Sequence, residues 1–366
     1  MSDKRECRAG PTPEVPAPEL EYLPRNPRSY NPGIGVIGCG GIIPYHLRAY
    51  RASGYRVLAL CDVTPSKAEQ QRRDFYPQAA VCRDYREVLA RPDIDVVDVA
   101  THPEDRVAIL EDALKAGKHV LSQKPFVLDL ADGERLADLA DERGLRLAVN
   151  QNGRWAPHFS YMRAVLGAGL IGEVTGAHMS IHWDHNWTAD TPFNNLEHLI
   201  LFDFAIHWFD MLRCVVDQRF VQRVYAAVSA TSHQLAKPPL LAEVTVEFDG
   251  AIGSLTFHAD TRYGAHDQTF IAGHLGTIAS AGPDLNAQTV TLFTQAGKAT
   301  PKLEGEWFTN GFHGAMAELL CAIEEEREPY HSARHNLDSL ALSFAAIASS
   351  QDHLPKVPWT VRRLPA

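Results

Sequence analysis

The stretch IGVIGCGGIIPYHLRAY, residues 34–50, decides the fold of the chain. A short β-branched run, a cluster of glycines and an amphipathic segment follow one another, which is the order that opens a dinucleotide-binding unit. A literal G-x-G-x-x-G begins at Gly33, ahead of the strand, where no phosphate can sit. The turn that fits is residues 38–43, in which Ile43 occupies the third position, where a small residue would be usual. Gly38 makes the tight bend there, and Gly40 lets a pyrophosphate approach the backbone at the start of the helix.

An acid follows about twenty residues later, as a dinucleotide site requires. Asp62 closes the run YRVLALCD, where a carboxylate accepts hydrogen bonds from ribose hydroxyls and repels a 2′-phosphate. No arginine follows Asp62 directly, so NAD is the expected cofactor and NADP is less favoured. The simpler alternative is an aspartate that caps the helix expected after Thr64.

Short apolar runs alternate with amphipathic segments as far as Asn150. The expected strands are IGVIG, YRVLALCD, AAVC, IDVVDVA, KHVLS and LRLAVN, and the expected helices are residues 43–53, 65–75, 104–116 and 131–144. This alternation is typical of βαβ units around a parallel sheet. It predicts an α/β fold whose N-terminal Rossmann domain, residues 33–152, holds a doubly wound parallel sheet.

Residues 153–366 have a different texture. Helices are expected at residues 158–168, 197–215, 311–325 and 335–350, and the alternating runs FVQRVYAAVSA, AEVTVEFD, AIGSLTFHA and TVTLF are expected strands. Their period of two indicates a large, mostly antiparallel open sheet in a C-terminal α+β domain. We expect this domain to bind substrate and to form a homodimer or homotetramer through its open face.

The N-terminal segment, residues 1–32, contains seven prolines and little apolar periodicity, which predicts an extended arm. Two alternatives are open for it, a disordered tail and an arm that packs on a neighbouring subunit.

Composition excludes several classes of protein. The formal net charge of −10 and the lack of a basic cluster argue against nucleic acid as a partner. No apolar run approaches the roughly 20 residues that span a bilayer, and the N-terminus lacks a secretory pattern, so we expect a cytoplasmic protein. The cysteines show no C-x-x-C spacing and are expected to be reduced: Cys7, Cys39, Cys61, Cys82, Cys214 and Cys321.

Three residues are candidates for chemistry. Lys124 follows the fifth strand, at the carboxyl edge where doubly wound sheets bind ligands. Asp203 and His207 lie four apart in the apolar run LILFDFAIHWFDML, where an unpaired charge would be costly. We expect Asp203 to orient His207 and raise its basicity, and His207 to take a proton from substrate. The plain alternatives are a surface lysine and a core histidine.

The segment SIHWDHNWTADTPFNN concentrates aromatic, amide and carboxylate groups, which suit the faces and hydroxyls of a carbohydrate. Trp183 and His185 are its main candidates, and Arg154 and Trp155 are expected to join the same wall. Interdomain packing of the aromatic rings is the alternative. A metal site built from His182, Asp184, His185 and His198 matches no standard ligand spacing, so no metal is expected.

These motifs resemble the glucose-fructose oxidoreductase, inositol dehydrogenase and rhizopine-catabolism (Gfo/Idh/MocA) family from residue 34 to the end. The matching pieces are GVIGCGGI, ALKAGKHVLSQKP, NQNGRWAP and LFDFAIHWFD. The family's Glu-Lys-Pro signature has a catalytic lysine and often a cis proline, which implies these features for Lys124 and Pro125. Gln123 replaces the signature glutamate, and Arg106 stands where relatives have a histidine.

The resemblance extends the expected sites. The expected cofactor residues are Gly38, Gly40, Gly41, Ile42, Asp62, Thr101, His102, Gln123, Lys124 and Asn150. The expected substrate residues are Lys124, Arg154, Trp155, Trp183, His185, Asp203 and His207. Together they imply an NAD-dependent dehydrogenase of a sugar, glycoside or cyclitol. Two alternatives are a redox-neutral hydrolase or lyase with tightly bound NAD, and a sensor without turnover, against which the presence of Lys124 and His207 speaks.

Overall fold

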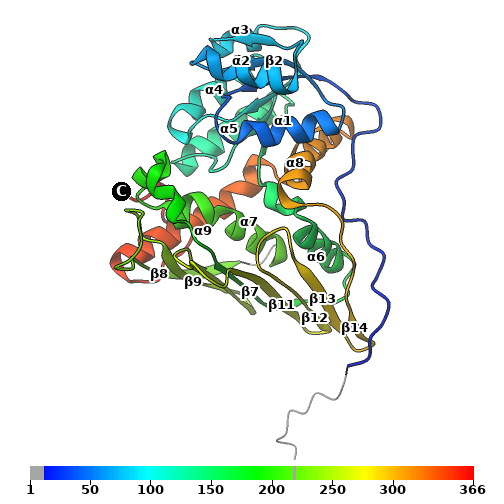
Figure 1. Cartoon of the computed structure of the whole chain (residues 1–366), viewed down its shortest axis with the longest axis vertical. Coiled ribbons are helices and arrows are strands. Elements are labelled where there is room, and N and C mark those ends of the chain that lie inside the picture. Colours follow the sequence, from blue (N-terminus) through cyan, green and yellow to red (C-terminus); the bar gives the residue numbers. More distant parts are fainter. Residues whose placement is uncertain (1–11, 217–219) are drawn as a thin grey trace, which may run out of the picture.

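A parallel sheet forms the upper layer of the computed structural model, which describes residues 12–216 and 220–366 (Figure 1). In this described part, the order is β3-β2-β1-β4-β5-β6, with every pairing parallel. The strands are β1 (Gly33–Ile37), β2 (Arg56–Cys61), β3 (Ala80–Cys82), β4 (Val96–Val99), β5 (His119–Ser122) and β6 (Leu147–Val149). The connecting helices are α1 (Ile43–Ala52), α2 (Pro65–Phe75), α3 (Tyr85–Leu89), α4 (Pro103–Lys115) and α5 (Leu130–Glu142). The predicted doubly wound fold is confirmed.

The short helix α3 was not predicted, because five residues are too few to show a periodicity. Its start is fixed locally by a capping box. The Asp84 side chain accepts from the Arg86 backbone N–H, and the Glu87 side chain accepts from the Asp84 backbone N–H.

A larger sheet forms the lower layer, in the order β14-β13-β12-β11-β7-β10-β9-β8 among the described residues. Its strands are β7 (Val174–His182), β8 (Val221–Ser229), β9 (Leu241–Phe248), β10 (Ala251–His258), β11 (His266–Gly273), β12 (Gly276–Gly282), β13 (Thr289–Thr294) and β14 (Gly297–Ala299). Only the β7–β10 pair is parallel within this described sheet. The mostly antiparallel sheet is therefore confirmed, although β7, β11, β12 and β14 were not predicted.

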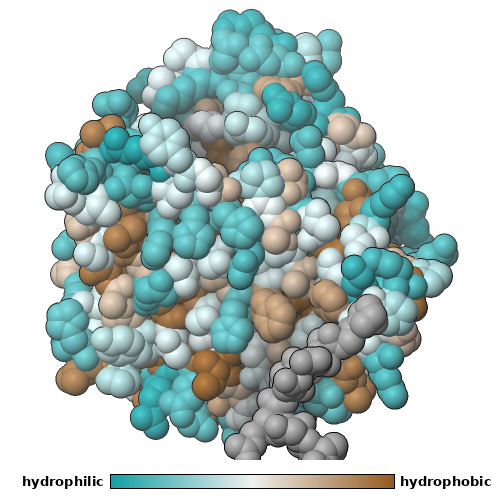
Figure 2. Space-filling model, turned by 60° about the horizontal axis from the view of Figure 1, so that its bottom comes forward, coloured by the Kyte–Doolittle hydropathy of each residue, from teal (hydrophilic) through white to brown (hydrophobic). Residues whose placement is uncertain are grey.

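Helices cover one face of the large sheet and leave the other face open (Figure 1). The covering elements include α6 (Pro157–Gly167), α7 (Ile206–Val215) and α9 (Ala333–Asp352). Figure 2 brings the bottom of the molecule forward and shows hydrophilic and hydrophobic side chains interspersed there. Tyr225, Ile252 and Phe270 are exposed apolar residues of the sheet. Assembly through this face stays a prediction.

The helix expected over residues 197–215 is divided in two, which corrects that prediction. Leu199–Phe204 form a π-helical turn, Ala205 interrupts it, and α7 begins at Ile206. A π-helical turn bonds residue i to i+5, so the regular α-helical spacing is interrupted between Asp203 and His207.

The N-terminal arm packs on the body of its own chain. The Val15 N–H donates to the carbonyl of Lys298 in β14, and Tyr22 meets Tyr161 of α6 edge to face. Farther along, the backbone N–H groups of Arg28, Ser29 and Tyr30 donate to the Glu324 carboxylate. Residues 12–32 are therefore not a disordered tail, and contact with a neighbouring subunit stays a prediction. Residues 1–11, including Cys7, lie outside the described part.

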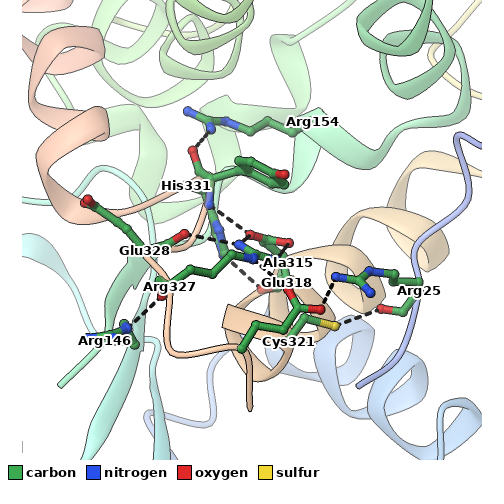
Figure 3. Close-up of polar contacts among 11 residues, drawn as sticks. Arg25, Arg146, Arg154, Ala315, Glu318, Cys321, Arg327, Glu328 and His331 are labelled. Carbon is green, nitrogen blue, oxygen red and sulfur yellow. Dashed lines mark hydrogen bonds and ion pairs between the residues drawn. The ribbon is translucent and has the colours of Figure 1, made fainter. Parts of the chain in front are cut away.

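The last two helices return to the Rossmann layer. Helix α8 (Trp307–Glu324) packs on α1, and the apolar contacts join Phe312 and Met316 to Ile43 and Leu47. The loop between α8 and α9 is held by charged groups (Figure 3). Arg327 pairs with Glu318 at 2.5 Å, and its carbonyl accepts from Arg146 beside β6 at 2.7 Å. The two layers are thus tied together at a polar junction.

The structure shows the state of the cysteines and the apolar character of the helices. The cysteines within the described residues, Cys39, Cys61, Cys82, Cys214 and Cys321, are free thiols. Among the helices of residues 12–216 and 220–366, none combines the length and apolar character needed to cross a bilayer.

One carboxylate is buried in the large sheet without compensation. Asp267 lies on the covered face of β11 and is 1% exposed, and both of its oxygens lack a hydrogen-bond partner within the described part of the chain. Burial, together with the charge of Asp284, raises the pKa of Asp267 to about 7. The unfolded chain ionises this group at its ordinary, lower pKa, so the stability present in acid is lost as pH rises toward 7.

We expect Asp267→Asn to stabilise the protein, and to do so more at pH 8 than at pH 5. The amide removes the cost of a buried charge, which a change of about 3 in pKa places on the order of 4 kcal/mol above pH 7. Thermal unfolding of the two proteins at both pH values measures the effect. An equal or lower Tm for the variant at pH 8 would contradict the buried, unpaired carboxylate.

Candidate active site

The glycine turn has the geometry of a phosphate-binding loop. Gly38 has φ +92°, and a Cβ there would lie 2.8 Å from the carbonyl oxygen of Ala100, so neither the conformation nor the space admits a side chain. Gly40 and Gly41 have nothing within 4 Å of a Cβ. Ile42 precedes α1, in which Pro44 has no N–H and the Ile43 and Tyr45 N–H groups donate to the carbonyls of Gly40 and Ile42. The space beside Gly40 and Gly41 is nevertheless open to a ligand.

Asp62 supports this turn directly. One carboxylate oxygen accepts from the Cys39 N–H at 2.9 Å, and the other accepts from the Thr64 N–H at 2.8 Å. The turn before Thr64 that the simpler alternative expected is thus present, but Asp62 does not cap α2, whose N-cap is Thr64 without a side-chain capping bond. Val63, the next residue, is 81% exposed.

The loop that carries Lys124 has a cis Lys124–Pro125 bond, as the resemblance implied. Arg106 holds this loop from inside. It is 1% exposed, and its guanidinium donates to the carbonyls of Gln123 at 2.6 Å, Pro125 and Thr101. Burial lowers the pKa of Arg106 to about 9, which still leaves it charged at neutral pH. Arg106, which stands where relatives have a histidine, therefore holds the Lys124 loop in place.

A buried polar network behind Lys124 was missed at the sequence level. Asp98 of β4 is fully buried and accepts from His46 Nδ1 of α1 at 2.7 Å. A ring that donates through Nδ1 accepts through Nε2, which lies 3.2 Å from the amide nitrogens of both Gln123 and Asn150. Gln123 Oε1 in turn accepts from the Lys124 N–H at 2.7 Å. The polar Asp98 within the apolar strand IDVVDVA was the available signal.

Lys124 and Asp203 form the central contact of the site. The amine donates to the Asp203 carbonyl at 2.9 Å and to its carboxylate Oδ2 at 3.1 Å. These contacts join the cis-proline loop of the Rossmann layer to the π-turn of the second layer. An ammonium has three N–H groups, and two of them are used here.

His207 differs from its expected role in one respect. Asp203 bonds to Lys124 rather than to His207. Burial, with the positive charge of Lys124, lowers the pKa of His207 well below its ordinary value. The expectation that Asp203 orients the imidazole and raises its basicity is therefore wrong. His207 Nδ1 is buried without a hydrogen-bond partner in the described residues.

Arg154 and Trp155 lie away from the expected substrate wall, which corrects that prediction. Arg154 is 1% exposed, and its guanidinium forms two bonds with Asp210, at 2.6 and 2.7 Å. Trp155 is buried against His331 and fits over Gly314 of α8, where a Cβ would collide with its ring. Both residues fasten α8 and α9 to the loop after β6.

The aromatic segment after β7 forms an aromatic wall near His207. Trp183 stacks on His185 with ring centroids 5.4 Å apart, and it meets Trp208 of α7 at 5.7 Å. Trp307 completes this wall, 5.8 Å from the His207 ring and 5.8 Å from Trp208. The signal for Trp307 was weak, because it stands alone at the start of α8.

Several polar atoms in and beside this wall are buried without a partner among the described residues: Trp183 Nε1, His185 Nδ1, His207 Nδ1 and Trp208 Nε1. Buried donors and acceptors are normally satisfied, so these atoms are candidates for hydrogen bonds to a polar ligand. Burial lowers the pKa of His185 to about 4, so this ring is neutral.

The residues considered for a metal do not converge. His182 faces the open side of the large sheet against His258, whereas His185 lies in the aromatic wall. Asp184 accepts from Asn186, and His198 bonds the carbonyl of Pro365. Within the described ranges, no group of His, Cys, Asp and Glu is arranged to hold a metal ion.

The residues expected around a nicotinamide fit such a group. Thr101 Oγ1 and Asn150 Oδ1 are buried at the carboxyl edge of the Rossmann sheet without partners in the described part of the chain. They lie beside Gln123 and Lys124, whereas His102 is exposed at the start of α4. Orphaned polar atoms at this edge, with the open turn at Gly40, match the needs of a dinucleotide.

Comparisons with known proteins agree with this arrangement. Residues 33–151 match the GFO/IDH/MocA oxidoreductase family with an NAD-binding Rossmann fold, and residues 159–279 match the GFO/IDH/MocA C-terminal domain. An inositol 2-dehydrogenase of Gluconacetobacter diazotrophicus is 29% identical over 249 residues, 67% of this chain and 72% of that protein. A D-apiose dehydrogenase of Paraburkholderia graminis is 26% identical over 87% of each chain.

A solved structure has the same fold. An oxidoreductase from Agrobacterium radiobacter, in complex with NAD+, L-tartaric acid and magnesium, superimposes with a TM-score of 0.80. The sequence identity is 21%, and the match covers 90% of this chain and 99% of that one.

We expect Gly40→Ala to weaken NAD binding by about tenfold or more without lowering Tm. A methyl group at this position meets no protein atom within 4 Å, but it occupies the approach to the backbone that a pyrophosphate needs. Calorimetric titration with NAD measures the affinity, and thermal unfolding measures Tm. Gly167→Ala, also free of contacts, is the matched control, and unchanged NAD affinity in Gly40→Ala would contradict the assigned turn.

Proposed function

Because the chain belongs to the GFO/IDH/MocA oxidoreductase family with an NAD-binding Rossmann fold, we propose that it oxidises a secondary alcohol of a sugar, glycoside or cyclitol with NAD. NAD accepts the hydride at its nicotinamide when it is bound. The observation that carries the proposal is the meeting of Lys124, Asp203 and His207 at the carboxyl edge of the Rossmann sheet. The names of the inositol and apiose dehydrogenases among its relatives support the substrate class.

Lys124 is proposed to hold the reacting oxygen. Its third N–H has no acceptor among the described residues, and its ammonium is fixed by Asp203. A donor in this position stabilises the negative charge that develops on the oxygen as its proton leaves. Asp203 thereby positions the amine rather than the imidazole.

His207 is proposed to receive the hydroxyl proton. Its lowered pKa keeps the ring neutral at neutral pH, so a nitrogen lone pair is free to accept. The nearby Lys124 charge and the burial that lower its pKa also favour prompt release of the proton afterwards. The aromatic wall of Trp183, Trp208 and Trp307 is proposed to exclude water and to pack on the C–H face of the substrate.

We expect Lys124→Ala and His207→Ala each to lower kcat by roughly 100-fold or more, with NAD affinity nearly unchanged. Pure enzyme, NAD and a panel of sugars and cyclitols are followed by NADH absorbance. Stoichiometric NADH supports the dehydrogenase, whereas product without net NADH supports the redox-neutral hydrolase or lyase. Full activity in either variant would contradict the assigned roles.

The pH profile gives a separate test. Because the pKa of His207 is lowered well below 6.5, protonation of this ring should not reduce kcat for alcohol oxidation until the pH falls below that value. Initial rates from pH 5 to 9 measure this. A loss of activity centred at or above pH 6.5 that is absent from the residual activity of His207→Gln would show that the imidazole titrates normally.

A further inference from the structure

We propose that Asp267, Thr269 and Ser280 form a second polar subsite that binds substrate hydroxyls remote from the oxidised carbon. This inference rests on the proposed function and specifies which part of the substrate is recognised. The three side chains come from β11 and β12 on the covered face of the large sheet, away from Lys124 and His207.

All three side chains are buried and unsatisfied. Asp267 and Thr269 are each 1% exposed and Ser280 is 2% exposed. Both Asp267 oxygens, Thr269 Oγ1 and Ser280 Oγ lack a hydrogen-bond partner within residues 12–216 and 220–366. Four orphaned oxygens in one place are unusual, because a buried polar atom left without a partner costs free energy.

The strand register brings these atoms together. Thr269 of β11 is directly opposite Ser280 of β12, and Asp267 is opposite Gly282. Gly282 has no side chain, and the loop that follows folds back over it, so that Gln288 Nε2 would lie 3.0 Å from a Cβ there. Gln288 Oε1 is also buried without a partner in the described chain. The amide of Gln288 therefore borders the same small region.

This region lies near the aromatic wall. Asp267 pairs with Ile181, two residues before Trp183 of that wall. From the other side, the backbone N–H of Trp307 donates to Asn286 Oδ1 at 3.0 Å, within the loop that covers Gly282. Because Trp307 also contacts His207, one loop and one indole separate the reacting group from the new subsite.

The chemistry of the subsite favours a polyhydroxylated ligand. A carboxylate and an amide oxygen accept hydrogen bonds, and the two hydroxyls accept or donate. An anionic ligand would be repelled by Asp267, whereas vicinal hydroxyls of a sugar or cyclitol supply the donors that the carboxylate lacks. Each satisfied oxygen would discriminate strongly against an analogue without the hydroxyl, because the partner would again be buried unpaired.

The buried carboxylate of Asp267 destabilises the fold, which also favours a role in ligand binding. An asparagine of nearly equal shape would relieve the buried charge, yet the chain carries the acid and places Asp284 near it. Buried groups that lower stability are commonly kept for binding or catalysis.

The test compares Asp267→Asn with the control Glu243→Gln, an exposed carboxylate of the same sheet, in the full chain saturated with NAD. We expect Asp267→Asn to raise KM for polyols such as myo-inositol or D-apiose at least tenfold, with NAD affinity unchanged and Tm at pH 8 raised. Glu243→Gln should leave KM within about twofold. Thr269→Val provides a second variant, in which only the hydroxyl is lost, and should raise KM severalfold.

Failure of this inference and failure of the proposed function give different results. If wild-type protein reduces NAD with a polyol and Asp267→Asn keeps the same KM for every polyol tested, the subsite is overturned while the function stands. If no polyol yields NADH, the function is overturned. In that case the subsite is tested by the change in Tm that each polyol causes in the presence of NAD. Equal changes in Tm for wild type and Asp267→Asn, or no change in either protein, would overturn the subsite.

Discussion

The contact between the Lys124 amine and Asp203 is the interaction on which the site depends, because it joins two layers that fold around separate sheets. The lysine leaves the Rossmann sheet in a cis-proline loop, and the aspartate lies in a π-turn of the second layer. An ion pair that is largely shielded from water is stable only with good geometry, so it fixes how the two layers meet. His207 and the aromatic wall take their positions from that meeting.

Buried polar and charged groups that the sequence pattern did not reveal hold the loop that carries Lys124. Arg106 binds its carbonyls from one side, and the Asp98–His46 pair orients Gln123 from another. Both are buried, so each contact is strong and each would be costly if one partner were lost. The two departures from the family pattern, Gln123 and Arg106, therefore fall within a single rigid support for one amine.

Buried polar atoms without partners divide into two groups in this structure. One group surrounds His207 and the expected nicotinamide, and the other lies on the large sheet around Asp267. Trp307 lies between them, in contact with His207 and anchored to the loop over Gly282. This continuity suits a ligand that carries hydroxyls on several carbons.

The sequence determined the doubly wound fold, the glycine turn, the acid after the second strand and the lysine at the carboxyl edge, because each depends on local periodicity or on short spacing. It also grouped Trp183, His185 and His207, which the structure brings together around Trp208. Only the tertiary structure decided that Asp203 bonds to Lys124, that Arg154 and Trp155 face the interior, and that Asp267 lies opposite Ile181, close to the aromatic wall. These outcomes depend on a π-turn, on a buried ion pair and on strand register. All three are set by contacts between residues far apart in the chain, which local pattern does not encode.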